Sequence, residues 1–124
     1  MRTPKQIIVM RKDLNMRKGK MIAQGAHASM KILADWVKQE PTPPFPQPLK
    51  EWLDGKFTKI CVSVNTQTEL EEVYNKAKEA GVLCALIEDS GLTEFKNVPT
   101  LTCCAVGPDY PEKLDPITGH LPLL

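Results

Sequence analysis

The sequence predicts an α/β protein with three layers, α/β/α, built around a mixed, mostly parallel four-stranded sheet. Four short apolar runs rich in β-branched residues alternate with two long helical patterns, and this alternation is typical of α/β folds. The 124 residues suffice for one hydrophobic core but not for two, so we expect a single domain over residues 1–124. With 42% hydrophobic and 25% charged residues, the composition excludes disordered and fibrous proteins.

The first half predicts a strand, a long helix and an irregular loop. Residues 5–12 centre on four apolar residues and predict a strand that is buried on both faces. Gly19 and Lys20 lead into a helix that extends to about Lys38, with an apolar stripe at spacings of four and seven: Ile22, Ala26, Leu33 and Val37. Five prolines within residues 41–48 exclude regular structure there and predict an extended loop. A short helical turn is expected over residues 49–54.

The second half predicts three further strands and a second long helix. Residues 57–64 form the second strand, and Thr66 and Glu69 form a capping box that opens a helix ending at Gly81. Residues 82–87 and 100–106 are the third and fourth strands, and the proline-rich tail has a short helix near Glu112. Right-handed crossovers make the first three strands mutually parallel. The fourth follows a loop without a helix and is therefore free to be antiparallel.

The charge is distributed unevenly along the chain. A net charge of +1 and a pI of about 7.6 argue, taken alone, against a nucleic-acid partner. However, residues 1–31 contain eight basic residues and one acid, a net charge of +7, whereas the other 93 residues carry a net charge of −6. This asymmetry is consistent with an anion-binding surface and also with a solvated basic face that has no partner.

The sequence predicts a cytoplasmic protein that does not cross a membrane. No apolar run approaches the roughly 18 residues of a membrane span, and residues 7–10 are too few for the core of a signal peptide. The four cysteines lack C-x-x-C spacing, and Cys103 and Cys104 would point to opposite faces of one strand. We therefore expect reduced thiols, no structural metal and no cofactor.

One candidate site lies on the first turns of the first helix. Lys20, Gln24 and His27 are spaced i, i+4 and i+7, so their side chains fall within roughly 40° of one another around the helix. Arg17 and Lys18 lie at the helix N-terminus, where free N–H groups and the helix dipole favour an anion such as phosphate. The alternative is an exposed helix edge that meets only water.

A second candidate site follows the third strand, at the sheet edge where α/β proteins bind ligands. Asp89 leaves the buried strand and is followed by a turn at Gly91 and by the hydroxyl of Thr93. Asp89 is suited to orient or deprotonate a water molecule, and Thr93 to donate a hydrogen bond to a substrate oxygen. The alternative is that both residues only stabilise their own turn.

Four segments, in order, resemble the class II peptidyl-tRNA hydrolases of archaea and eukaryotes: residues 13–28, 80–93, 105–108 and 117–121. The resemblance covers nearly the whole chain except the proline-rich loop. It implies hydrolysis of the ester that joins a peptide to the 3′ end of tRNA, without a metal and often in a homodimer. Peptidyl-tRNA and a second copy of the chain are therefore the expected partners.

The resemblance also implies roles for the two candidate sites, because the positions of Lys20, Gln24, His27, Asp89 and Thr93 match the family's active site. Under this hypothesis Asp89 activates water, Lys20 stabilises the oxyanion or a terminal phosphate, and His27 is an auxiliary acid–base group or a support. Gln24 and Thr93 would hydrogen-bond the substrate, and the basic segment with Arg17 and Lys18 would bind tRNA phosphates.

Two features depart from the family pattern. Leu92 and Glu94 stand where the family usually carries a basic residue and a glutamine, and residues 41–48 form a loop that the resemblance does not cover. A non-catalytic tRNA- or protein-binding module on the same fold is therefore the alternative function. Hydrolysis of another ester or amide is a third hypothesis.

Overall fold

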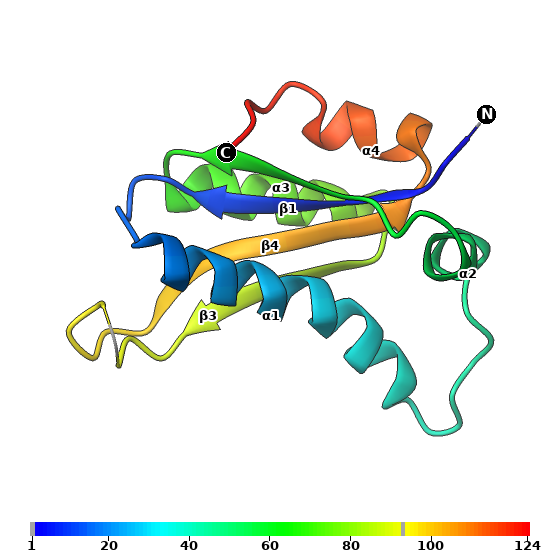
Figure 1. Cartoon of the computed structure of the whole chain (residues 1–124), viewed down its shortest axis with the longest axis horizontal. Helices are drawn as coiled ribbons and strands as arrows, with labels where there is room; N and C mark the ends of the chain where they lie inside the picture. Colours follow the sequence, from blue (N-terminus) through cyan, green and yellow to red (C-terminus); the bar gives the residue numbers. More distant parts are fainter. Residues whose placement is uncertain (1, 93) are drawn as a thin grey trace.

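The computed structural model describes residues 2–92 and 94–124 and shows four helices around one four-stranded sheet (Figure 1). The first half of the chain forms β1 (Lys5–Arg11), α1 (Lys18–Val37), α2 (Gln47–Asp54) and β2 (Lys59–Val64). The second half forms α3 (Gln67–Glu79), β3 (Cys84–Asp89), β4 (Thr100–Asp109) and α4 (Pro111–Thr118). Every predicted element is present, within a few residues of its predicted bounds, and α2 begins at Gln47, inside the loop predicted over residues 41–48.

The sheet has the strand order β2-β1-β4-β3. β1 and β2 are parallel, and β4 is antiparallel to both β1 and β3, so β1, β2 and β3 point the same way. The predicted α/β class and strand directions are confirmed. However, although three of the four strands point the same way, only β1 and β2 are hydrogen-bonded as a parallel pair. β4 lies between β1 and β3 and is antiparallel to both. The connection through α3 carries the chain from one edge of the sheet to the other and leaves the place beside β1 to β4.

Helices cover both faces of the sheet, with α1 on one face and α3 and α4 on the other (Figure 1). Alternate residues of β1 enter the two cores: Ile8 and Met10 contact the α1 side, whereas Ile7 and Val9 contact the α3 side. The same alternation separates Cys103 from Cys104, which are both buried. Their predicted placement on opposite faces is confirmed.

The buried face of α1 is not the predicted apolar stripe. Gln24, Gly25, Ala28 and Ile32 are buried, whereas Ile22 is 73% exposed. A Cβ on Gly25 would lie 3.7 Å from the Ile8 side chain, so small residues on this face let α1 approach the sheet closely. The helix predicted from this stripe is present, but Ile22, Ala26 and Leu33 of the stripe line a groove beside β2 instead of facing the centre of the sheet.

The loop between β1 and α1 is fixed to the sheet by Arg11. The guanidinium of Arg11 donates to both carboxylate oxygens of Asp13, at 3.1 and 2.7 Å, and to the carbonyl of Leu101 at 2.9 Å. The hydrogen bond from Arg11 holds the pKa of Asp13 below its usual value. Because this loop leads directly into α1, Arg11 helps to position the start of the helix against β4.

The two edges of the sheet differ. Residues 122–124 lie along the outer side of β2, where the backbone of Ser63 donates to Pro122 at 2.9 Å and that of Leu124 donates to Cys61 at 3.0 Å. In the part of the chain that the structure describes, β3 has no strand on its outer side. Over those same residues, no helix combines the length and the apolar character that crossing a membrane requires.

Candidate active site

The end of β3 and the first turns of α1 bring three predicted site residues together. The Lys20 ammonium lies 2.9 Å from Asp89 Oδ1, and Gln24 Nε2 donates to the same oxygen at 3.3 Å. The side chains of Lys20 and Asp89 are only 13% and 12% exposed. The i, i+4 spacing on α1 therefore aims an ammonium and an amide at one nearly buried carboxylate.

The second oxygen of Asp89 is held by the turn that follows β3. Gly91 N donates to Asp89 Oδ2 at 2.8 Å. Gly91 has a φ of +86°, and a Cβ at this position would lie 2.3 Å from the carbonyl oxygen of Val98. Only glycine fits this close approach, so Gly91 both closes the turn and fixes the rotation of the carboxylate.

The surroundings of Asp89 keep it ionised. The hydrogen bond from Lys20 is the strongest influence and lowers the pKa of Asp89, and the bonds from Gly91 and Gln24 act in the same direction against the opposing effect of burial. Asp89 is thus a fixed anion at neutral pH. Such a group orients a water molecule by accepting its proton in a hydrogen bond, and it accepts that proton fully only as the reaction proceeds.

Thr102 belongs to this cluster and was missed by the sequence analysis. Its hydroxyl donates to Gln24 Oε1 at 2.6 Å, which turns the amide nitrogen of Gln24 toward Asp89. Ile87 pairs with Cys103 and Glu88 pairs with Leu101, so Thr102 is the extra residue of a β-bulge. Strict alternation along β4 would place the Thr102 side chain on the other face of the sheet from that of Cys103. The bulge redirects it, and no local sequence signal marks the position.

We expect Thr102→Val to lower kcat/KM about tenfold, because valine keeps the shape of threonine but leaves Gln24 Oε1 without its donor. Thr102→Ser retains the hydroxyl and should restore most of the activity. Steady-state kinetics on the two variants, with thermal unfolding as a control for folding, measure this positioning role. Equal activity of the valine and serine variants would contradict it.

The other predicted site residues lie outside this cluster. His27 is exposed one turn after Gln24, and no described residue hydrogen-bonds to its ring, but it lines the same groove as Gln24 and Asp89. Arg17 and Lys18 are exposed at the start of α1. Thr93 lies outside the described residues, so its predicted role stays a prediction.

Glu94 occupies part of the region predicted to bind an anion. Its Oε1 lies 3.4 Å from both the backbone nitrogen and the Nε of Arg17, at the N-terminus of α1. Its Oε2 is buried without a hydrogen-bond partner among the described residues. An internal carboxylate therefore lies where a phosphate was expected, although the Arg17 side chain is 91% exposed and its pairing is weak.

The excess of basic residues in 1–31 is partly neutralised in the folded protein. Six of the eight basic side chains lie within 4 Å of a carboxylate, most of them from later in the chain: Arg2, Lys5, Arg11, Arg17, Lys20 and Lys31. The charge asymmetry along the sequence thus overstates the asymmetry of the surface. The surface charge could not be predicted from the sequence, because the sequence does not tell which acidic residues fold back onto this segment.

The cluster opens into a groove of about 880 Å³ between α1 and β3. Gln24, His27 and Asp89 lie along it, and it continues past Lys31 toward the C-terminal half of α1. Over residues 2–92 and 94–124 there is no group of three or more His, Cys, Asp or Glu side chains arranged to hold a metal ion. The described residues that meet at Asp89 offer a carboxylate, an ammonium and an amide.

An ionised carboxylate beside an ammonium in a groove has the chemistry to orient a water molecule against a carbonyl that the ammonium polarises. Residues 4–124 match the family described as peptidyl-tRNA hydrolase PTH2, and the chain belongs to this family. This confirms the resemblance seen in the sequence.

Curated relatives agree with the family assignment. Peptidyl-tRNA hydrolases of Methanocaldococcus jannaschii and Methanothermobacter thermautotrophicus are 43% and 42% identical to this chain, over 97% of it and 99% of each relative. A solved structure of a protein of unknown function from Agrobacterium is 13% identical, with a TM-score of 0.62 over 100% of this chain and 99% of that one. That likeness shows the fold alone.

Proposed function

We propose that this chain hydrolyses the ester between the peptide and the 3′-terminal ribose of peptidyl-tRNA, with Asp89 holding the attacking water. The observation that carries the proposal is the carboxylate of Asp89, fixed by Lys20, Gln24 and Gly91 at the mouth of a groove. The family and the activity named in its relatives supply the substrate class.

This geometry supports the following course for the proposed reaction. Water held by Asp89 attacks the ester carbonyl carbon, and its proton moves toward the carboxylate as the new C–O bond forms. Lys20 lies beside Asp89 and stabilises the negative charge that develops on the carbonyl oxygen. When the tetrahedral intermediate collapses, the ester C–O bond breaks and the proton passes to the ribose oxygen, giving a free peptide and tRNA with a 3′-hydroxyl. Thr93 and His27 are further candidates for contacts with the substrate.

Binding of the tRNA is assigned to the exposed basic residues around the start of α1, which include Lys12, Arg17 and Lys18. A phosphate would compete with Glu94 for Arg17, and the exchange is feasible because exposed ion pairs contribute little stability. Only a few phosphates can be contacted by so small a set, so we expect a modest salt dependence of tRNA affinity.

The test is a hydrolysis assay on N-acetyl-aminoacyl-tRNA compared with free aminoacyl-tRNA carrying the same amino acid. We expect release of tRNA from the blocked substrate at a rate at least about tenfold higher, because the blocked form carries the peptide bond that distinguishes peptidyl-tRNA. Salt-dependent tRNA binding without any release would instead support the non-catalytic module. Hydrolysis of simple esters without a tRNA requirement would support the third hypothesis.

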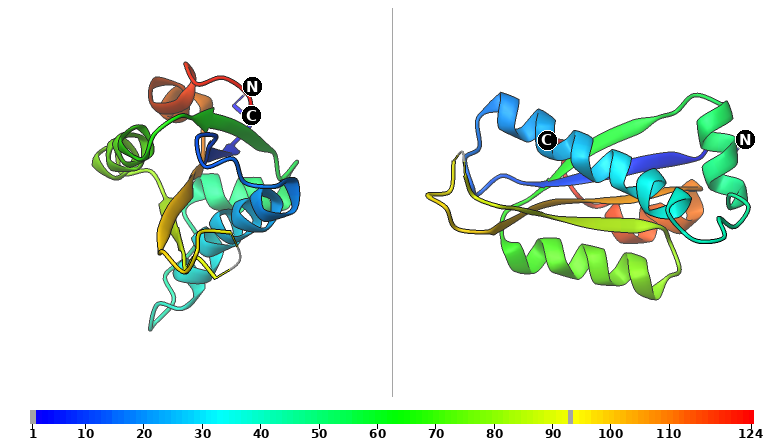
Figure 2. Two further views of the ribbon diagram at one scale, coloured as in Figure 1. Left: turned by 90° about the vertical axis from the view of Figure 1, so that its left-hand side faces the viewer. Right: turned by 90° about the horizontal axis from the view of Figure 1, so that it is seen from below.

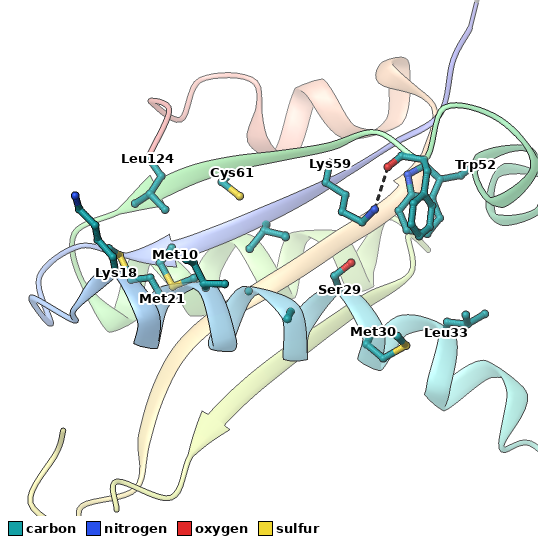
Figure 3. A pocket seen from close by; sticks show the side chains of 15 residues that line it. Met10, Lys18, Met21, Ser29, Met30, Leu33, Trp52, Lys59, Cys61 and Leu124 are labelled. Carbon is teal, nitrogen blue, oxygen red and sulfur yellow. Dashed lines mark hydrogen bonds between the residues drawn. The ribbon is translucent and has the colours of Figure 1, made fainter. Parts of the chain in front are cut away.

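Dimerisation is the second part of the proposal and rests on a groove on the other side of α1. This groove, of about 670 Å³, is lined mainly by apolar side chains from α1, β1, β2 and α2 (Figure 3). Ile22 and Met30 stand exposed along its rim on α1. The exposed side chains of Ile22 and Met30 lie on the same face as the groove. In a two-fold dimer, these side chains of one copy could enter the groove of the other, and the contact would cover the apolar side chains of both.

Ile22→Lys is expected to shift the protein from dimer to monomer, because it places a charge in the middle of the proposed interface. Light scattering coupled to size-exclusion chromatography, run across a concentration series, measures the mass. Leu92→Lys is the matched control, since Leu92 is equally exposed but lies in the loop after β3. A monomeric wild-type chain at all concentrations would contradict the dimer.

The non-catalytic alternative is not favoured, because relatives that match nearly the whole chain are named peptidyl-tRNA hydrolases and because Lys20, Gln24 and Asp89 form a connected cluster. A cytoplasmic location is proposed from the translational substrate of the family and from the four free cysteines.

A further inference from the structure

The groove beside Asp89 runs along an open edge of the sheet. From Asp89 it follows β3 backward, with Leu86 and Ile87 on one wall and α1 residues on the other. A smaller hollow beside Leu83 and Cys84 continues the same line and shares Asp35 with it. Viewed onto that edge, β3 lies between α1 and α3, and none of the described strands lies in front of it (Figure 2, right).

Over residues 2–92 and 94–124, the backbone hydrogen-bonding groups on the outer edge of β3 have no partner strand, and these groups face this groove. Leu83 O accepts from Gly107 N at 2.7 Å, so Leu83, Ala85 and Ile87 direct their N–H and C=O groups toward β4. Because successive strand residues alternate, Cys84 and Leu86 direct theirs to the open side. The opposite edge of the sheet differs, since residues 122–124 already pair with β2 there.

The charge around this groove does not suit a nucleic acid. Lys31 and Lys38 are offset by Asp35 and Glu88, and Lys31 is paired with Asp35 at 3.3 Å. The exposed basic residues of the α1 N-terminus lie beyond Asp89, at the other end. Asp89 therefore separates a basic side from a nearly neutral groove, and these two sides correspond to the tRNA and peptide halves of the ester.

We propose that the peptide half of the substrate lies in this groove as an added strand on the free edge of β3. The inference rests on the proposed function. A hydrolase of peptidyl-tRNA meets peptides of any sequence. Pairing through the backbone suits such a substrate because it does not depend on the peptide's side chains. Affinity for the peptide then comes from main-chain hydrogen bonds made by Cys84 and Leu86.

The geometry also fixes the direction of the peptide. The scissile carbonyl is at the peptide C-terminus and must lie at Asp89, which is the C-terminal end of β3. The peptide therefore runs parallel to β3, with its N-terminal part toward Leu83. From residue 83 to residue 89 the edge spans about 20 Å, which accommodates an extended peptide of about six residues.

The first test uses the wild-type chain and N-acetylated peptidyl-tRNAs of one to eight residues with the same C-terminal residue. We expect kcat/KM to rise roughly tenfold between one and about five residues, mainly through KM, and then to level off. A second series places one N-methyl group at each peptide position in turn. Methylation should lower kcat/KM at alternate positions only, because only alternate N–H groups face β3.

The matching protein variant is Ala34→Trp, which fills the groove about 21 Å along α1 from Lys20. It should reduce the gain from longer peptides while leaving hydrolysis of N-acetyl-aminoacyl-tRNA unchanged. Asn75→Trp, on the exposed side of α3, adds the same side chain elsewhere and should change neither.

The outcomes separate this inference from the proposed function. Hydrolysis that is independent of peptide length, or an N-methyl effect without alternation, overturns the added strand and leaves the hydrolase assignment intact. Absence of hydrolysis on every peptidyl-tRNA overturns both. A length dependence that Ala34→Trp does not alter places the peptide elsewhere, for instance in the apolar groove beside β2.

Discussion

Asp89→Asn is expected to lower kcat for peptidyl-tRNA about 10³-fold with little change in KM. The amide keeps the size of the carboxylate and can still accept the hydrogen bond from Gly91 N, but it cannot take the proton of an attacking water. It also leaves Lys20 without its counter-charge in a nearly buried position. Single-turnover hydrolysis of N-acetyl-aminoacyl-tRNA measures the loss independently of product release.

Glu88→Gln is the matched control for this prediction. Glu88 precedes Asp89 on the same strand but is exposed. Removing its charge should leave kcat unchanged. This result would show that the loss in Asp89→Asn comes from the Asp89 carboxylate itself and not from a lower negative charge at this edge of the sheet. If Asp89→Asn retained near-normal turnover while remaining folded, Asp89 would not be the group that activates water.

The elements of this fold were predictable because their signals are local. The capping box, for example, forms as expected: Thr66 Oγ1 accepts from Glu69 N at 3.0 Å, and Glu69 reaches back to the backbone of Asn65 at 3.3 Å. The burial of β1 on both faces also follows directly from its uninterrupted apolar run. Such patterns depend on the residues of one segment and need no knowledge of its neighbours.

What the sequence did not predict depends on how segments meet. The stripe containing Ile22 is apolar, yet it faces a groove while the smaller residues around Gly25 face the sheet. No pattern within α1 distinguishes these two surfaces. The neutralisation of Arg17 by Glu94 is of the same kind, since the two residues are 77 positions apart in the chain.

The candidate site shows the same division between local and non-local information. The spacing of Lys20 and Gln24, and the position of Asp89 after a strand, were visible in the sequence and lead to the cluster that the structure shows. Thr102 was not visible, because a one-residue bulge in β4 decides which way it points. Residues that act on the site through other residues are the part that the sequence concealed.

Lys20→Met is expected to lower kcat about 10²- to 10³-fold, because the ammonium is the group that we propose to stabilise the developing oxyanion. Lys20→Arg retains a positive charge and should recover part of this loss. Lys18→Met removes a neighbouring charge from the side proposed to bind tRNA and should raise KM with little effect on kcat. This split distinguishes stabilisation of the transition state from simple attraction of tRNA.

The pH dependence of the Lys20→Met variant tests the pairing itself. In the wild-type chain the hydrogen bond from Lys20 is the strongest influence lowering the pKa of Asp89, whereas burial raises it. Removing the ammonium leaves burial in place, so the pKa of Asp89 rises and the carboxylate is protonated at a higher pH. The acidic limb of kcat/KM should therefore move upward in Lys20→Met and remain in place in Lys18→Met. An unmoved acidic limb would mean that the ionisation of Asp89 does not limit the reaction, and the role of water activation would have to pass to another group along the groove, with His27 the nearest candidate on α1.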